Sequence, residues 1–233
     1  MGRSAMSAGQ ALFLVGGRGT RLGDLTADIP KPLLPVSGRP FIEHLLDKAV
    51  REGFDDLILL AGYRHEAVEA YAGRWCGVPL RVSVEPAPLD TAGAIAHARV
   101  LLAEQFLVVN GDTWFDFDWS SLRLLAGVSA LIAARHVAPA DRYETLDVVD
   151  DRVVGIRRRA DVAAGLINGG VYRMRRESFV DIKGRASLEQ DVLPSLCSAG
   201  ALAASIETGN FIDIGLPSSL AGADHVVGPR KTD

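Results

Sequence analysis

Three glycines directly follow an apolar run near the N-terminus, at Gly16, Gly17 and Gly19. Glycines allow positive φ angles and a close approach of the backbone, so several N–H groups can converge on one anion. Three cationic side chains stand within or after this cluster: Arg18, Arg21 and Lys31. This combination predicts a loop that wraps the phosphates of a nucleotide.

Two common phosphate-binding motifs do not fit this loop. A Walker-type loop needs a lysine directly after its last glycine, and here no lysine follows until Lys31. The dinucleotide fingerprint needs a third glycine where Leu22 stands. The second expected strand, residues 57–61, also ends without the acid that binds a ribose.

Two aspartates lie at the ends of apolar segments. Asp112 ends the run Val-Val-Asn-Gly-Asp, and Asp213 lies within Phe-Ile-Asp-Ile-Gly. Each aspartate alone is also compatible with a turn or a helix cap. In a chain with a phosphate-binding loop the pair predicts a Mg²⁺ site, because Mg²⁺ is bound by one or two carboxylates plus phosphate oxygens.

The first half of the chain alternates between two periodicities. Apolar runs predict strands over residues 11–15, 57–61, 80–85 and 106–110, and helical spacing predicts helices over 41–52, 65–74 and 91–104. This order implies parallel strands with right-handed crossovers, which bind ligands at their carboxyl ends. Residues 16–21 and 110–112 are therefore expected to converge on one crevice.

The second half is more mixed and is expected to cover that crevice. Strands are predicted over 128–134, 169–174, 201–206 and 211–214, with a hairpin of 145–149 and 153–157 around Asp150-Asp151. A helix is predicted over 187–197, with Ser187 as its N-cap and Gln190 three residues on, and Pro217 starts the last helix. The fold class is α/β, a Rossmann-like three-layer sandwich with a mostly parallel central sheet.

Composition excludes several classes of function. The chain has 233 residues and a net charge of −4, so no nucleic-acid partner is expected and the local cations serve a small molecule. No apolar run reaches the roughly 20 residues needed to span a bilayer, so no membrane partner is expected. Cys76 and Cys197 imply no disulfide framework, which favours the cytoplasm; Cys76 is expected to be a buried small hydrophobe. A homodimer is left open.

The glycine loop and the segment after it resemble the signature of the sugar-1-phosphate nucleotidylyltransferases. The family pattern Gly-Gly-x-Gly-Thr-Arg-Leu matches residues 16–22, and Pro-Lys-Pro-Leu matches residues 30–33. Val15 stands where the family usually has alanine. The resemblance extends, with gaps, from about residue 11 to about residue 221. The chain shows no internal repeat or low-complexity linker, so a single domain is predicted over 10–227, with a nucleotide-binding half (10–115) and a sugar-phosphate-binding half (116–227). The ends at 1–9 and 228–233 are predicted to be disordered.

The resemblance implies transfer of a nucleoside monophosphate from a nucleoside triphosphate to a sugar 1-phosphate. Both reactants are anions, so catalysis consists of suppressing repulsion, aligning the groups and stabilising charge. Arg21 is expected at the β- and γ-phosphates, and Lys31 at the α-phosphate or the attacking phosphate. Asp112 and Asp213 match the aspartates that hold Mg²⁺. A loop arginine or lysine is otherwise most often a solvated surface charge.

Nucleotide binding is expected from the glycine loop and from residues 85–95, which resemble the base-recognition segment. The expected residues are Val15, Gly16, Gly17, Gly19, Thr20, Arg21, Glu85, Thr91, Ala92, Gly93, Asn110 and Gly111. Gly93 would let the start of a helix approach the base. Glu85 is the candidate acceptor for a guanine N–H and amino group. Asp90 replaces a frequent glycine and is expected to cap the helix that Thr91 begins.

Sugar-phosphate binding is expected from Arg159, Asn168, Gly169, Gly170 and Glu189, by resemblance. Arg159 falls where the family has a lysine, although an arginine fork is not its equivalent. A basic edge strand that discourages aggregation explains the arginine run equally well. Asn168 is also compatible with a turn, and Glu189 with an acid in the first turn of a helix.

Among the short family members, the chain looks most like the heptose 1-phosphate guanylyltransferases. The carrying segments are Pro-Leu-x-Thr-x-Gly-Ala-Ile (88–95) and Asn-Gly-Asp-Thr-Trp-Phe-Asp-Phe-Asp (110–118). Three alternatives stay open: a mannose-1-phosphate guanylyltransferase, a UTP-dependent enzyme for an amino-sugar phosphate such as N-acetylmuramate 1-phosphate, and a catalytically silent paralogue that binds sugar nucleotides.

Overall fold

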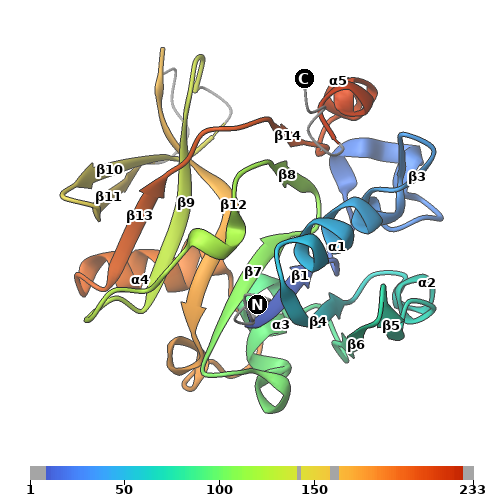
Figure 1. Ribbon diagram of the computed structural model, residues 1–233, viewed down its shortest axis with the longest axis horizontal. Coiled ribbons are helices and arrows are strands. Elements are labelled where there is room, and N and C mark those ends of the chain that lie inside the picture. The colour runs from blue at the N-terminus through green and yellow to red at the C-terminus, as the bar shows by residue number, and fades with distance from the viewer. Residues whose placement is uncertain (1–8, 141–142, 158–162, 228–233) are drawn as a thin grey trace, which may run out of the picture.

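The computed structural model describes residues 9–140, 143–157 and 163–227, which fold around one ten-stranded mixed β-sheet (Figure 1). The strands of this sheet are β1 (Gly9–Leu14), β4 (Phe54–Ala61), β5 (Gly73–Trp75), β6 (Val78–Val84), β7 (Gln105–Asn110), β9 (Ala130–Val137), β10 (Thr145–Val149), β11 (Arg152–Arg157), β12 (Gly165–Arg175) and β13 (Leu202–Ile206). Their order across the sheet is β10-β11-β13-β9-β12-β7-β1-β4-β6-β5.

The N-terminal strands form the predicted parallel block. β6, β4, β1 and β7 are parallel neighbours, and all four point their carboxyl ends the same way. In β1, Phe13 belongs to one core cluster and Leu12 to the other, so the strand is apolar on both faces. Beyond β7 the sheet is mixed, because β12 runs antiparallel to both β7 and β9, while β13 is parallel to β9.

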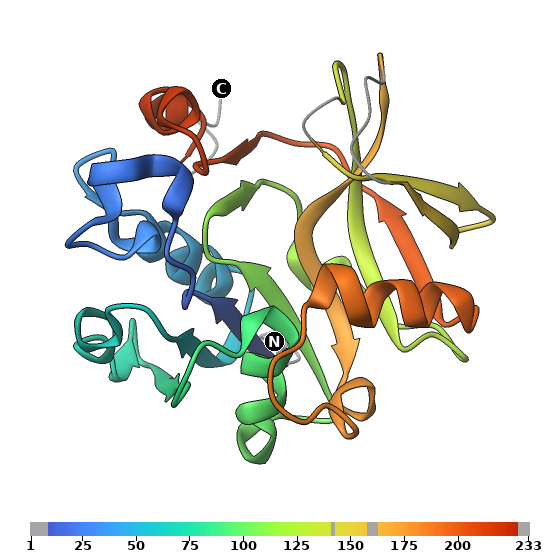
Figure 2. The ribbon, with the colours of Figure 1, turned by 180° about the vertical axis from the view of Figure 1, so that it is seen from behind.

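Helices cover both faces of the sheet, so the predicted three-layer fold class is confirmed. Helix α1 (Phe41–Arg51) packs its buried Leu45 and Leu46 on one face, with the core cluster around Phe13. Helices α3 (Asp90–His97) and α4 (Leu193–Ser198) lie on the opposite face, as Figure 2 shows from behind, and bury Ile95 and Leu193 in the cluster around Leu12.

The end of the chain returns to the N-terminal part of the molecule. Strand β14 (Phe211–Asp213) pairs antiparallel with β8 (Thr113–Phe115), a short strand that periodicity did not reveal. Helix α5 (Pro217–Gly222) follows β14 (Figure 1). Ala223 and Val227, just after it, enter the same core cluster as α1. This return brings Asp213 to the end of β7.

Three tight turns produce local structure that differs in part from the prediction. Helix α2 (His65–Glu69) is shorter than expected, because Gly73 has φ 130° and starts β5 instead of continuing the helix. Cys76 and Gly77 have positive φ angles in the two-residue turn between β5 and β6, and Cys76 is exposed rather than buried. A similar unpredicted hairpin joins β2 (Pro35–Val36) to β3 (Arg39–Pro40). The hairpin at Asp150-Asp151 is confirmed.

Two predicted helices end or begin differently. Helix α3 ends at His97, and residues 99–101 form a separate turn. A π-helical turn, Leu188–Val192, precedes α4, and the Ser187 hydroxyl accepts a hydrogen bond from the Gln190 N–H at 3.1 Å, which confirms the predicted cap. Gly9 begins β1, while the other terminal residues expected to be disordered lie outside the described residues. No helix of the described residues is long and apolar enough to cross a membrane.

Candidate active site

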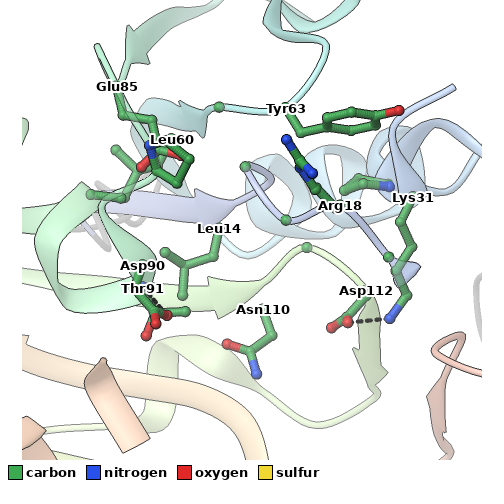
Figure 3. Close-up of a pocket in the computed structure, with 18 of the residues that line it drawn as sticks. Leu14, Arg18, Lys31, Leu60, Tyr63, Glu85, Asp90, Thr91, Asn110 and Asp112 are labelled. Carbon is green, nitrogen blue, oxygen red and sulfur yellow. Dashed lines mark hydrogen bonds and ion pairs between the residues drawn. The ribbon is translucent and has the colours of Figure 1, made fainter. Parts of the chain in front are cut away.

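A cavity of about 780 Å³ opens at the carboxyl ends of the parallel strands (Figure 3). The glycine loop after β1 lines it together with residues 110–112 at the end of β7, so the two segments predicted to converge do so. Residues after β4 and β6 complete this edge, among them Tyr63 and Glu85. The shared direction of the strands therefore creates the site.

The glycine loop is held close to the sheet by main-chain hydrogen bonds. Gly16 accepts a bond from the Tyr63 N–H at 3.0 Å, and a Cβ at Gly16 would lie 3.1 Å from the nitrogen of Gly62. Gly19 has φ 63°, and a Cβ there would lie 3.0 Å from the Lys31 Cβ. Val15 is buried below the loop and does not line the cavity, whereas Gly16, Gly17, Gly19, Thr20 and Arg21 do.

Lys31 joins the two predicted metal-binding aspartates. Its ammonium contacts Oδ2 of Asp112 and lies 3.8 Å from Oδ1 of Asp213. The pairing of β8 with β14 causes this approach, and the Ile214 N–H donates to the Asp112 carbonyl oxygen at 2.9 Å. Gly215 N–H donates to Asp213 Oδ1 at 2.6 Å. Two carboxylates and one ammonium therefore lie together at one corner of the site, where Lys31 and Asp112 line this cavity and Asp213 lines a neighbouring one.

Glu85 lies at the far end of the cavity from this corner, near Leu14 and Leu60 (Figure 3). Its Oε2 accepts a hydrogen bond from the Leu89 N–H at 2.9 Å. Its carboxylate packs against Gly62, where a Cβ would lie 2.1 Å from Oε1. Burial raises the pKa of Glu85, and the nearby charge of Asp90 adds to that rise, while the bond from Leu89 opposes it.

Ala92 and Gly93 do not line the cavity. Both of their N–H groups donate to the carbonyl oxygen of Ala186, at 2.9 and 3.0 Å. A Cβ at Gly93 would lie 2.6 Å from the Gly184 carbonyl oxygen. Gly93 is thus required for the packing of α3 against residues 184–186, and its expected role beside the base stays a prediction.

Asp90 lies where the cavity meets a second one, and Thr91 lines the first cavity beside it. Asp90 has φ 63°, which explains why glycine is frequent at this position; aspartate tolerates this conformation better than most residues. Its Oδ1 accepts a bond from the Thr91 N–H at 2.8 Å, and its Oδ2 lies 3.7 Å from Arg185. The expected cap is wrong, because α3 begins at Asp90 itself, with Leu89 at its N-cap position and no side-chain cap. The Thr91 hydroxyl donates to Glu189 at 3.1 Å.

The second cavity measures about 390 Å³ and shares Asp90, Asn110, Asp112 and Glu189 with the first. Asn168 and Gly170 line it, as expected. Gly169 does not, because a Cβ there would lie 2.6 Å from the Ala133 carbonyl oxygen, so this glycine serves the packing of β12 on β9.

Buried polar groups surround the junction of the two cavities. Burial raises the pKa of Glu189, against hydrogen bonds that include those from Thr91 and Ser187. Asn168 donates to the Tyr172 hydroxyl at 2.7 Å and accepts from the Gly170 N–H at 3.0 Å. The Asn110 Oδ1 is buried without a hydrogen-bond partner among the described residues, on a residue that lines both cavities.

Several lining residues were not predicted from the sequence. These are Tyr63, His65, Arg185, Tyr143, Glu144, Gln190 and Phe211. Tyr63 could have been found from the sequence, because it closely follows a parallel strand, and ligands bind at the carboxyl ends of such strands. At this strand end the sequence was searched only for an acid that binds a ribose. Arg159 lies outside the described residues. The neighbouring Arg157 pairs with Asp147 at 2.7 Å on the exposed β10–β11 hairpin.

Comparisons with known proteins agree on one family. The family model described as "Nucleotidyl transferase" matches residues 10–227. The chain is 34% identical to D-glycero-alpha-D-manno-heptose 1-phosphate guanylyltransferase of Campylobacter jejuni, over 89% of this chain and 95% of that protein. It is 33% identical to the enzyme of the same name from Aneurinibacillus thermoaerophilus, over 89% and 94%.

A solved structure shares the fold over nearly the whole chain. The structure of HddC from Yersinia pseudotuberculosis complexed with GMP-PN superposes with a TM-score of 0.81. The sequence identity is 30%, and the match covers 93% of this chain and 98% of that one.

Proposed function

Because this chain belongs to the nucleotidyl transferase family, we propose that it transfers GMP from GTP to D-glycero-alpha-D-manno-heptose 1-phosphate and releases pyrophosphate. The observation that carries this proposal is the pair of adjoining cavities, which meet at Asp112. One cavity carries the glycine loop and cations suited to a nucleotide, and the other carries polar groups suited to a sugar.

The reaction joins two anions. An oxygen of the sugar phosphate forms a bond to the α-phosphorus of GTP, and the bond from that phosphorus to the bridging oxygen breaks. Pyrophosphate leaves with the electron pair. Arg21 on the exposed glycine loop would bind the β- and γ-phosphates, and Lys31 at the junction would neutralise the α-phosphate or the attacking phosphate.

Asp112 and Asp213 would hold a Mg²⁺ ion. Both carboxylates approach the Lys31 ammonium, and oxygen donors of this kind match the preference of magnesium. Within the described residues no group of three or more acidic, histidine or cysteine side chains could hold a metal, so phosphates and water would complete the ligand set. When bound, the ion supplies positive charge to the phosphates.

The part of the larger cavity around Glu85 favours guanine as the base. The Glu85 carboxylate can accept both the ring N–H and the amino group that guanine presents side by side. Uracil has one ring N–H between two carbonyls and matches a carboxylate poorly. The names of the relatives that match over both full lengths support the same base.

The sugar end supports a ring with neutral hydroxyls. Its lining includes Glu144, Glu189, Gln190 and Asn168, and no lysine or arginine among the described residues. An acid-rich lining disfavours a sugar that carries its own carboxylate, such as N-acetylmuramate 1-phosphate. Mannose 1-phosphate remains the second candidate, because it too presents only neutral hydroxyls. The retention of Arg21, Lys31, Asp112 and Asp213 speaks against a silent paralogue.

Release of pyrophosphate tests the proposal directly. Purified protein is incubated with Mg²⁺ and each pair of one triphosphate (GTP, UTP, CTP or dTTP) and one sugar phosphate (heptose, mannose or N-acetylmuramate 1-phosphate). We expect the highest kcat/KM with GTP and the heptose. A preference for UTP contradicts the choice of base, and no release with any pair contradicts an enzymatic role.

The cysteines are free, which supports a cytoplasmic location. A homodimer stays a prediction.

A further inference from the structure

Tyr63 contacts the segment from Gly16 to Ala27 at three separate points. Its N–H donates to the Gly16 carbonyl oxygen at 3.0 Å, at the start of the loop. Its hydroxyl donates to the Ala27 carbonyl oxygen at 2.8 Å, beyond the end of the loop. Its ring lies 5.6 Å from the guanidinium carbon of Arg18, within the range of a cation–π contact. One residue thus spans the whole segment, with its main-chain N–H at one end and its side chain along the rest.

Arg18 lines the nucleotide cavity, and its side chain lies beside the Tyr63 ring (Figure 3). Within the described residues no carboxylate lies within salt-bridge distance of its guanidinium. Arg64 provides an internal comparison. It lies 5.8 Å from the same ring but pairs with Asp28 at 3.1 Å and does not line the cavity. Of the two arginines on this ring, Arg18 alone faces a site for anions.

We propose that Arg18 is an additional ligand for the polyphosphate of the nucleotide, and that Tyr63 is the positioning residue that holds it. This inference rests on the proposed function. The glycine motif leaves position 18 open, so the arginine adds a third cation to Arg21 and Lys31. A free arginine loses much rotamer freedom when it binds a phosphate. Stacking on Tyr63 restricts the side chain in advance, which lowers that loss on binding.

The test measures the dissociation constant of inorganic pyrophosphate by calorimetry, with Mg²⁺ in the buffer. We expect Arg18→Gln to weaken binding by about tenfold, because it removes a charge-assisted contact. Arg18→Lys should recover part of that loss. Tyr63→Leu should weaken binding by several-fold, and Tyr63→Phe, which keeps the ring, should remain near wild type. The double variant Arg18→Gln/Tyr63→Leu should bind no more weakly than Arg18→Gln alone.

Two matched controls separate this role from general effects. Arg64→Gln also removes a guanidinium that lies beside the Tyr63 ring, but Arg64 does not line the cavity. We expect the dissociation constant of pyrophosphate to change by less than about twofold, as for remote surface charges. Tyr71→Phe removes a tyrosine hydrogen bond of 3.0 Å to Glu43, away from the cavity, and should leave the dissociation constant unchanged. Thermal unfolding of each variant checks that it folds.

Steady-state kinetics provide the second readout. Arg18→Gln should raise the KM for GTP and leave the KM for the sugar phosphate within about twofold, since the lost contact is to one substrate. Unchanged pyrophosphate binding in Arg18→Gln, or no binding by the wild type, overturns the inference. An equal effect of Tyr63→Leu with and without Arg18 overturns the role of Tyr63. A wild type that binds pyrophosphate through Arg18 but transfers no nucleotide overturns the proposed function alone.

Discussion

Thr91 and Glu189 are joined by a hydrogen bond of 3.1 Å, in which the Thr91 hydroxyl donates to Oε2 of Glu189. The same hydroxyl accepts a bond from the Leu188 N–H at 2.7 Å. Thr91 belongs to α3 and lines the larger cavity, and Glu189 belongs to the π-helical turn before α4 and lines both cavities. One hydroxyl therefore ties the orientation of Glu189 to α3.

Thr91→Val removes this hydroxyl and keeps the shape of the side chain. We expect kcat/KM for the sugar 1-phosphate to fall by about tenfold, because an unpaired buried polar group costs about 1–3 kcal/mol. The KM for GTP should change less. Thr91→Ser, which keeps the hydroxyl, serves as the control and should retain most activity. Equal losses toward both substrates would contradict the assignment of Glu189 to the sugar.

Asp112→Asn and Asp213→Asn test the metal site. Each should lower turnover by at least about a hundredfold, because aligned charge stabilisation is worth several kcal/mol. Chelation of the metal should abolish activity, and added Mg²⁺ should restore it. Asp28→Asn is the control, since this exposed aspartate forms an ion pair with Arg64 and does not line the cavity. Near-normal turnover of either Asp112→Asn or Asp213→Asn with Mg²⁺ present would contradict the assignment of these aspartates to the metal.

The raised pKa of Glu85 predicts how recognition of GTP depends on pH. Guanine requires the ionised carboxylate, and burial shifts its protonation to a pH above the ordinary carboxyl value of 4.5. As pH falls through this raised pKa, the KM for GTP should rise. Glu85→Gln should flatten this dependence and reduce discrimination between GTP and UTP by about 2–4 kcal/mol. A pH profile of kcat/KM that is identical in both proteins would refute the role of Glu85.

The raised pKa of Glu189 predicts a conflict between stability and function. Its folded pKa exceeds the unfolded value, so the fold favours the protonated form. Stability from this group is present at low pH and is lost as pH rises through the raised pKa. At neutral pH, Glu189→Gln should raise Tm, where a gain of about 1 kcal/mol corresponds to about 2–4 °C, and should raise the KM for the sugar phosphate.

Glu104→Gln is the matched control for that measurement, because its side chain is 82% exposed. It should change neither Tm nor the KM. A Tm of Glu189→Gln below that of the wild type at neutral pH would show that the ionised carboxylate stabilises the fold, contrary to the direction of its pKa shift.

Local chemistry determined much of the fold and part of the site in advance. Apolar runs marked the parallel strands, Ser187 and Gln190 marked a helix start, and Asp150-Asp151 marked a hairpin. Each of these signals acts within a few residues, so it can be recognised without knowledge of the partner elements. The glycine loop, Lys31 and the two aspartates were recognised for the same reason, since their residue types suit phosphates and magnesium wherever the chain brings them together.

Tertiary structure alone decided what each of these residues contacts. Gly93 and Gly169 were expected beside ligands, yet the carbonyl oxygens of Gly184 and Ala133 explain why neither tolerates a Cβ. A glycine in a sequence indicates that a Cβ would clash at that position, but it does not identify the neighbouring atom with which the Cβ would clash. Helix α2 was predicted too long because Gly73, inside the predicted range, has φ 130° and starts β5, whose pairing with β6 is a tertiary contact.

The contacts that build the site join residues far apart in the chain. Asp213 reaches Lys31 because β14 pairs with β8, and Tyr63 reaches Arg18 because β4 lies beside β1 in parallel register. Residue types and their spacing specified a phosphate loop, acidic strand ends and the strands that carry them. Strand pairing, which depends on the packing of the whole sheet against both helix layers, selected the neighbours of each side chain.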